Sequence, residues 1–234
     1  MKILAFDTST DVCSVCVAID KKVVAECITR GPQTHTERLM PAIELLFSQL
    51  DWEIRSLDGL AVVNGPGSFT GLRIALSVAK GLALALGIRI AAASALEVAA
   101  LQVSDHGLIG PAMDARRGEI FACLYERTEN GLRNITSPRS VAPEQWRSEL
   151  PDVPIRFCGP GAALYLDQIK NHPSSTLLFK DFVLAETLAD FAFKKFEAGD
   201  VHDASEIKAA YLRPSDAETK GPRPRKPLQR VPRS

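Results

Sequence analysis

Two aspartates occur in similar short motifs, one near the start of the chain and one at its middle. Asp7 follows an apolar run in ILAFDTST, and Asp114 follows a second one in IGPAMDARR. If a duplicated fold places both at equivalent hairpin turns, they face one cleft and could hold magnesium with a nucleotide. Thr8 and Ser9 would lie in the same cleft. Two ordinary turn aspartates are the alternative, because aspartate is common in turns.

A glycine-rich stretch, NGPGSFTGLR at residues 64–73, is the other candidate for chemistry. A P-loop requires a lysine and a hydroxyl residue directly after its last glycine, whereas here the last glycine precedes LR. A dinucleotide-binding turn requires three glycines at the first strand–helix junction and an acidic residue after the next strand, and neither is present. The stretch is therefore predicted to be a turn that starts a helix, capped by Ser68 or Thr70.

The helix predicted after this turn has two apolar faces. Small residues form one stripe and a shorter second one, at Gly71, Ala75, Ala79 and Ala83 and at Ser77 and Gly81. Because small stripes let another element approach closely, we expect one face to pack in the core and the other against a partner or the rest of the chain. Arg73 is unfavourable to the dipole in the first turn, so it either faces solvent or pairs with a carboxylate or phosphate.

Other catalytic sets are missing from the sequence. The four histidines, His35, His106, His172 and His202, show no metal-binding spacing. No G-x-S-x-G elbow occurs. Cys13 and Cys16 lie three apart in an alternating strand pattern, so their thiols should diverge rather than form a redox or zinc pair. We predict no catalytic residue and no metal site, and free thiols favour a reducing cytoplasm.

The composition is that of an ordinary globular protein. The 234 residues are 46% hydrophobic, and 28 Lys and Arg balance 28 Asp and Glu. A net charge of zero excludes a strong general attraction to RNA or anionic lipid. Residues 72–93 are apolar but are interrupted by charges and glycines, so no membrane span is expected, and no secretory signal is recognised. Residues 214–234 form a basic, proline-rich tail that should be disordered or loosely docked.

The elements that position the candidate residues follow a repeated order. The first hundred residues read as βββαβαβ and a helix, and the next hundred partly repeat this, with GLRNITSP as a possible third strand. Thr34 and Glu37 predict a capping box at the first helix, and Pro41 predicts a kink or a later start. We expect an α/β fold of two lobes from a duplicated βββαβα unit. The lobes are residues 1–104 and, smaller or degenerate, 105–213.

Several segments together resemble the TsaB (YeaZ) family. They are ILAFDTST, HTERLMPAI, VVNGPGSFTGLRIALSVAKGLA, MDARRGEIF and YLRP, in order over residues 1–214, and GPGSFTGLR is the most specific. HTERLMP departs mildly from the family's usual H-S-E-x-L-L-P. The resemblance implies a two-lobed actin/sugar-kinase/Hsp70-like (ASKHA) fold. It also implies a cytoplasmic role in forming N6-threonylcarbamoyladenosine (t6A) on tRNAs that read ANN codons.

The resemblance implies that the chain is not itself the catalyst. It would pair with the catalytic homologue TsaD through helices of the first lobe and enable recruitment of the ATPase TsaE, and it could form a homodimer when alone. ATP or ADP and the metal would belong to the partners, the chain itself having no cofactor, and tRNA would be reached through the complex. Asp7, Thr8, Ser9 and Asp114 would then be vestigial cleft residues. The residues expected to face the partner are Leu39, Ile43, Leu46, Leu72, Arg73, Ala75, Leu76, Ala79, Leu82 and Ala83.

Two other functions remain open. A stand-alone ATPase or kinase of the same fold class would use Asp7 or Asp114 to hold magnesium, although no basic phosphate ligand follows DTST. A peptidase has less support, because the sequence offers neither a nucleophile–base pair nor a metal site.

Overall fold

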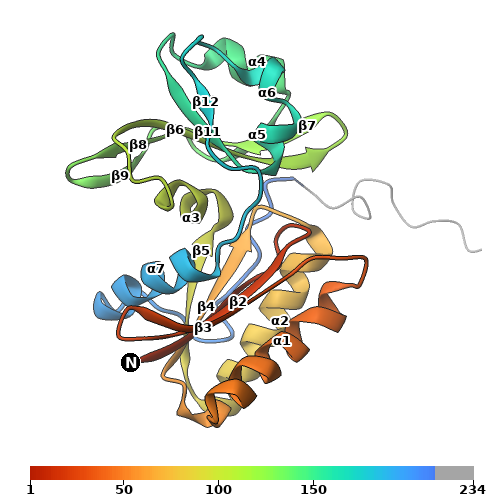
Figure 1. Cartoon of the computed structure of the whole chain (residues 1–234), viewed down its shortest axis with the longest axis vertical. Helices are drawn as coiled ribbons and strands as arrows, with labels where there is room; N and C mark the ends of the chain where they lie inside the picture. Colours follow the sequence, from red (N-terminus) through yellow and green to blue (C-terminus); the bar gives the residue numbers. More distant parts are fainter. Residues whose placement is uncertain (214–234) are drawn as a thin grey trace, which may run out of the picture.

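The computed structural model describes residues 1–213, and the basic tail expected at residues 214–234 lies outside the described part. The described residues form two lobes, each built around a β-sheet (Figure 1). In the first lobe the strand order is β3-β2-β1-β4-β5. These strands are β1 (Lys2–Asp7), β2 (Cys13–Ile19), β3 (Lys22–Thr29), β4 (Gly59–Gly65) and β5 (Arg89–Ser94).

The second lobe repeats the first. Its main path is β10-β7-β6-β11-β12, and each neighbouring pair has the same relative direction as its counterpart in the first sheet. The strands are β6 (Gly107–Arg116), β7 (Glu119–Ala122), β10 (Arg139–Val141), β11 (Ile155–Cys158) and β12 (Thr176–Leu177), with helices α4 (Pro143–Glu149), α5 (Pro160–Leu164) and α6 (Leu166–Ile169). The two-lobed ASKHA-like class and its duplicated unit are confirmed.

An additional hairpin, β8 (Tyr125–Thr128) and β9 (Gly131–Asn134), extends from β6 in the second lobe. GLRNITSP forms β9, so its interpretation as the third strand of the repeat is wrong. That position belongs to β10, which pairs with β7. The reason is burial, because Val141 of β10 lies beside Ile120 of β7 in the core of this lobe.

Alternate residues of β1 face two separate cores, on the two faces of the first sheet. The helices of this lobe are α1 (His35–Leu50), α2 (Phe69–Leu86), α3 (Ala95–Leu101) and α7 (Ala185–Glu197), with a 3-10 turn η1 (Ile54–Ser56). Leu4 and Phe6 pack with α1 and α2, whereas Ile3 and Ala5 pack with α3 and α7. Figure 1 shows α7 opposite the α1–α2 layer. A sheet buried on both faces explains why its central strands are continuous apolar runs.

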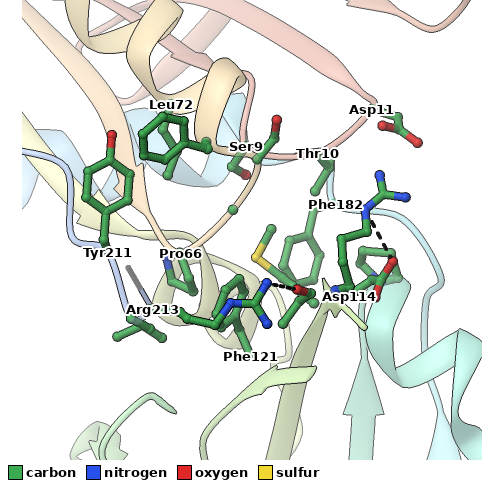
Figure 2. A pocket seen from close by; sticks show the side chains of 18 of the residues that line it. Ser9, Thr10, Asp11, Pro66, Leu72, Asp114, Phe121, Phe182, Tyr211 and Arg213 are labelled. Atoms are coloured by element: carbon green, nitrogen blue, oxygen red, sulfur yellow. Dashed lines mark hydrogen bonds and ion pairs between the residues drawn. The ribbon is translucent and has the colours of Figure 1, made fainter. Parts of the chain in front are cut away.

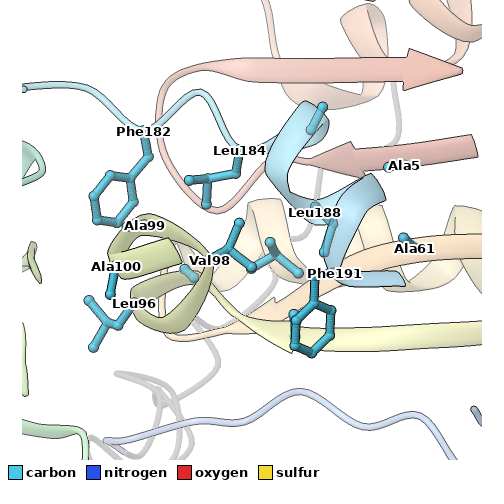
Figure 3. Close-up of a cluster of buried hydrophobic side chains, with 14 of the residues drawn as sticks. Ala5, Ala61, Leu96, Val98, Ala99, Ala100, Phe182, Leu184, Leu188 and Phe191 are labelled. Carbon is cyan, nitrogen blue, oxygen red and sulfur yellow. The ribbon is translucent and has the colours of Figure 1, made fainter. Parts of the chain in front are cut away.

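Helix α7 belongs to the first lobe, although the sequence placed it within the second lobe expected at residues 105–213. Its apolar stripe, including Leu188 and Phe191, packs with Val98 of α3 and Ala61 of β4 (Figure 3). The chain thus returns to the first lobe after Phe182. The physical reason is that the sheet face opposite α1 and α2 is apolar and requires a cover.

The start signals of the two long helices are where the sequence put them. Thr34 and Glu37 form a complete capping box at α1. The helix begins at His35 and continues through Pro41, so the later start that this proline suggested is wrong. The cap satisfies the first amides and fixes the start ahead of the proline. At α2 the cap is Ser68, whose side chain accepts from the Gly71 amide.

Among the described residues, α2 is the one helix whose length and apolar composition would allow it to cross a membrane. Its buried residues pack with the first sheet in a core that also contains α1. About a third of the helix is buried, 33% of its residues, so this packing accounts for one apolar side of α2 and leaves a second one outward.

Candidate functional site

The two candidate aspartates occupy equivalent places in the duplicated fold. Asp7 ends β1, and its Oδ1 accepts from the Ser9 amide at 2.8 Å. Asp114 lies in β6 just before the hairpin turn, and its Oδ1 accepts from the Arg116 amide at 2.8 Å. The same bond to the residue two positions later is thus made in both lobes, which supports the alignment of the two motifs.

A cavity of about 750 Å³ separates the lobes beside these aspartates (Figure 2). The first lobe contributes the loop after β1 and the turn before α2, and the second contributes the β6–β7 hairpin and both ends of α5. Ala210–Arg213 form part of the wall between the two. Phe121 and Phe182 add aromatic surface. This interlobe cleft is mostly apolar, with Asp11 on its first-lobe side and more charged groups, such as Asp114 and Arg116, on its second-lobe side.

The four predicted cleft residues divide into two pairs. Ser9 and Asp114 line the cleft. Asp7 and Thr8 are fully buried beneath it, and the Thr8 hydroxyl donates to the Gly71 carbonyl at 2.8 Å. The cleft-facing position expected for Asp7 is therefore occupied in the structure by the loop that follows it.

Burial dominates the electrostatics of Asp7. Loss of water raises the pKa of its carboxyl group to about 6, against the opposing effect of hydrogen bonds from Ser9 and Thr8. Its Oδ2 has no hydrogen-bond partner among the described residues. A carboxyl group in this state holds its proton to a higher pH than usual, and its burial leaves it no open path to a nucleotide-bound metal in the cleft.

The glycine-rich turn is bound to the protein's own backbone. The Ser68 amide donates to the Ser9 carbonyl at 2.7 Å. A Cβ on Gly67 would lie 2.6 Å from that carbonyl oxygen, and a Cβ on Gly71 would lie 1.9 Å from the Thr8 oxygen. Glycine is thus required for close packing of this turn against the β1–β2 loop. This supports the prediction of a structural turn over that of a phosphate cradle.

Arg73 makes an intramolecular contact that was not among the alternatives drawn from the sequence. Its guanidinium lies over the Phe69 ring, 3.8 Å from the centroid. Its Nε donates to the Tyr211 hydroxyl at 3.1 Å, and the Tyr211 ring stacks on Phe69 with centroids 4.9 Å apart. The Arg73 side chain is exposed, yet its position is fixed by Tyr211, close to the last residue that the structure describes. No local sequence signal pointed to Tyr211, which lies 138 residues away.

The structure places most of the expected partner-facing residues in the chain's own core. Only Arg73 and Leu82 of the ten reach the surface. The eight buried residues are Leu39, Ile43, Leu46, Leu72, Ala75, Leu76, Ala79 and Ala83. The expectation is therefore wrong for these eight. The Ala75–Ala79–Ala83 stripe lets α2 lie close to the sheet, so its small size serves internal packing.

The outward side of α2 carries the second small stripe. Ser77, Gly81 and Ala85 are exposed, and a Cβ on Gly81 would meet nothing within 4 Å. The two helices also carry partly or fully exposed apolar side chains: Ile74, Val78, Leu82, Leu84 and Leu86 of α2 and Met40 and Leu45 of α1. We call this surface the α1–α2 face. A groove lined by Thr36, Phe69, Arg73 and the next turn of α2 lies at one end of it.

The remaining reactive side chains are structural. Cys13, Cys16, Cys123 and Cys158 are buried, and burial raises the pKa of each thiol. His35 is buried and accepts at Nδ1 from Arg38 at 3.2 Å, and burial together with the Arg38 charge lowers its pKa. Among residues 1–213, no three His, Cys, Asp or Glu side chains are grouped so that they could hold a metal ion.

A relative from Bacillus subtilis, named tRNA threonylcarbamoyladenosine biosynthesis protein TsaB, is 34% identical over 94% of this chain and 97% of its own length. The chain belongs to the TsaB (YeaZ) family. The Escherichia coli protein of the same name is 36% identical to this TsaB-family chain over 56% of it and 58% of its own length.

Two further similarities agree with membership of the TsaB family. The family model described as TsaD, tRNA N6-adenosine threonylcarbamoyltransferase, matches residues 23–167, so the chain carries a TsaD-like domain. The solved structure of YeaZ from Pseudomonas aeruginosa superposes with a TM-score of 0.77 at 27% identity, covering 90% of this chain and 99% of that chain.

Proposed function

We propose that this chain is a non-catalytic assembly subunit for t6A formation on ANN-decoding tRNAs, acting in the cytoplasm. The observation that carries the proposal is its similarity over nearly the whole chain to a protein named for threonylcarbamoyladenosine biosynthesis. The catalytic homologue TsaD is its partner, the ATPase TsaE joins the pair, and tRNA is bound by the assembly.

The chemistry of the interlobe cleft supports a non-catalytic role. The first-lobe aspartate is buried with a raised pKa, and the glycine-rich turn is closed by backbone contacts. Two arginines of the cleft, Arg116 and Arg213, are paired with Asp114 and Glu119, and these carboxylates offset the positive charge that phosphoryl or acyl transfer would need to stabilise developing negative charge. A fold of this class with such a cleft suits a scaffold for an active homologue.

The α1–α2 face supports pairing through the first lobe. It combines small exposed residues at Ser77 and Gly81 with apolar side chains such as Leu84, which is 76% exposed. Large contiguous apolar patches on a protein surface mark interaction sites. TsaD, or a second copy when the chain is alone, would bury this face.

Reconstitution tests the proposal. The purified chain alone is expected to form no t6A and to hydrolyse no ATP, whereas adding TsaD, TsaE, tRNA and the threonylcarbamoyl donor should give product that disappears when this chain is left out. Formation of t6A by the chain alone would contradict the non-catalytic role. Full activity of the other components without it would contradict any role as a subunit.

A stand-alone ATPase or kinase is the second candidate, and the cleft with its equivalent aspartates is the observation in its favour. Calorimetric titration with ATP and magnesium decides between the two. Saturable binding of ATP that Asp114→Asn weakens would favour this candidate. If the purified chain gives no heat of binding, this candidate is excluded.

A further inference from the structure

We propose that residues Ala210–Arg213 form an interlobe clasp whose closure is coupled to occupation of the α1–α2 face. The clasp would fix the angle between the lobes, and a partner on the α1–α2 face would stabilise its closed state. The coupling rests on the proposed function, because that function supplies the partner.

The first half of the clasp binds the first lobe. The Ala210 amide donates to the Asn64 carbonyl at 2.8 Å, at the end of β4. Tyr211 then stacks on Phe69 and accepts from Arg73, both in the first turns of α2. Tyr211 extends toward the start of α2 in Figure 2. Three contacts of different kinds therefore join the clasp to the structures on either side of the glycine-rich turn.

The second half of the clasp binds the second lobe. Arg213 pairs with Glu119 at 3.0 Å and donates to the Ala115 carbonyl at 2.7 Å. Glu119 also accepts from Ser140 of β10 at 2.7 Å, which fixes it for the pairing. The Arg213 side chain extends toward the β6–β7 hairpin in Figure 2. Only Leu212 separates the residue held by α2 from the residue held by this hairpin.

Phe69 provides the link to the partner surface. It lines the interlobe cleft and also the groove at the end of the α1–α2 face. Arg73 lines the same groove. A partner side chain in the groove would therefore contact the ring and the guanidinium that hold Tyr211, and would restrict both to the positions that close the clasp. Linkage is reciprocal, so a closed clasp must strengthen partner binding by the same factor.

A spin-label experiment on the full chain tests the clasp without any partner. Labels at Gln49→Cys on α1 and Arg147→Cys on α4, with the half-buried Cys27 changed to Ser, report the interlobe distance by electron–electron resonance. Tyr211→Ala and Arg213→Gln should broaden the distance distribution, and Tyr211→Phe, which keeps the stacked ring, should change it less. Lys208→Ala, an exposed side chain on the same segment, is the matched control. An unchanged distribution in both Tyr211→Ala and Arg213→Gln would refute the clasp.

A binding experiment with TsaD tests the coupling. Tyr211→Ala should weaken the affinity roughly five- to tenfold, with Lys208→Ala unchanged, and TsaD should slow hydrogen exchange at the Ala210 amide. A broadened lobe distance with unchanged affinity and exchange would refute the coupling and leave the proposed function standing. No binding of TsaD by the wild-type chain would refute the proposed pairing and the coupling together, while the spin-label result would still decide the clasp.

Discussion

At the scale of single residues, duplication has preserved a hydrogen bond and changed its surroundings. Asp7 and Asp114 each accept from the amide two positions later, yet Asp7 is fully buried and Asp114 lines the cleft. A turn motif constrains the backbone, whereas access to solvent depends on the loops packed over it. The similar motifs FDTST and MDARR therefore predicted that Asp7 and Asp114 occupy equivalent positions, but they could not predict that the two side chains differ in burial.

The burial of Asp7 predicts a specific pH dependence of stability. The pKa of its carboxyl group is about 6 in the fold, against an ordinary value of 3.8, so the folded state disfavours the charge. The resulting loss of stability is greatest above pH 6 and diminishes as the pH falls toward 4. Between pH 4 and pH 7 it amounts to about 2 kcal/mol. Asp7→Asn should remove this dependence.

Urea unfolding of Asp7→Asn at several pH values measures this effect. The free energy of unfolding of the wild type should fall relative to that of Asp7→Asn as the pH rises from 4 to 7. Most of this fall should occur between pH 4 and pH 6. Asp152→Asn, which changes an exposed carboxylate, serves as the control and should follow the wild type. Parallel curves for the wild type and Asp7→Asn would show that burial does not perturb this group.

At the scale of elements, α2 has two small stripes with different roles. Ala79 is completely buried against the sheet, and Gly81 faces open space two residues later. Ala79→Glu would bury an unpaired charge and should destabilise the fold by more than about 4 kcal/mol. Gly81→Glu should fold normally, with a gain of up to about 1 kcal/mol from helix propensity, but should block pairing with TsaD.

Thermal unfolding and co-purification with TsaD separate the two effects in this matched pair. A stable Ala79→Glu variant would show that the core assignment is wrong. Normal co-purification of Gly81→Glu would exclude the centre of the α1–α2 face from the interface.

The sequence predicted elements well wherever the signal was local. The Thr34–Glu37 box, the Ser68 cap and the order of elements in the first hundred residues depend on neighbouring residues, and these were recovered, whereas the third strand of the second repeat was misplaced. The small stripe on α2 shows where this reasoning ends. Spacing of four revealed two apolar sides, but which side faced the sheet depended on packing with strands far away in the sequence. The contact between Arg73 and Tyr211 lay beyond sequence reasoning for the same reason.

At the scale of the whole molecule, one hydrophobic core runs through both lobes. It contains Ile3 and Ala61 of the first sheet, Leu188 of α7, and Met113 and Phe182 of the second lobe. The boundary drawn after residue 104 from the sequence therefore divides a continuous core. Helix α7 follows the second lobe in the sequence but packs in the first lobe. The first lobe therefore consists of two segments, one before and one after the second lobe.

This arrangement predicts that residues 1–104 do not fold alone. Without α7, the apolar face of the sheet that carries Ile3 and Ala61 would be exposed to water. This exposure is unfavourable, and the net stability of a lobe of this size is too small to offset it. An amide NMR spectrum of this fragment should show poor dispersion, in contrast to residues 1–213. Joining residues 1–104 through a Gly/Ser linker to residues 184–213 restores the cover and should recover dispersion. A well-dispersed spectrum from residues 1–104 alone would mean that the first lobe is autonomous and that α7 only docks onto it.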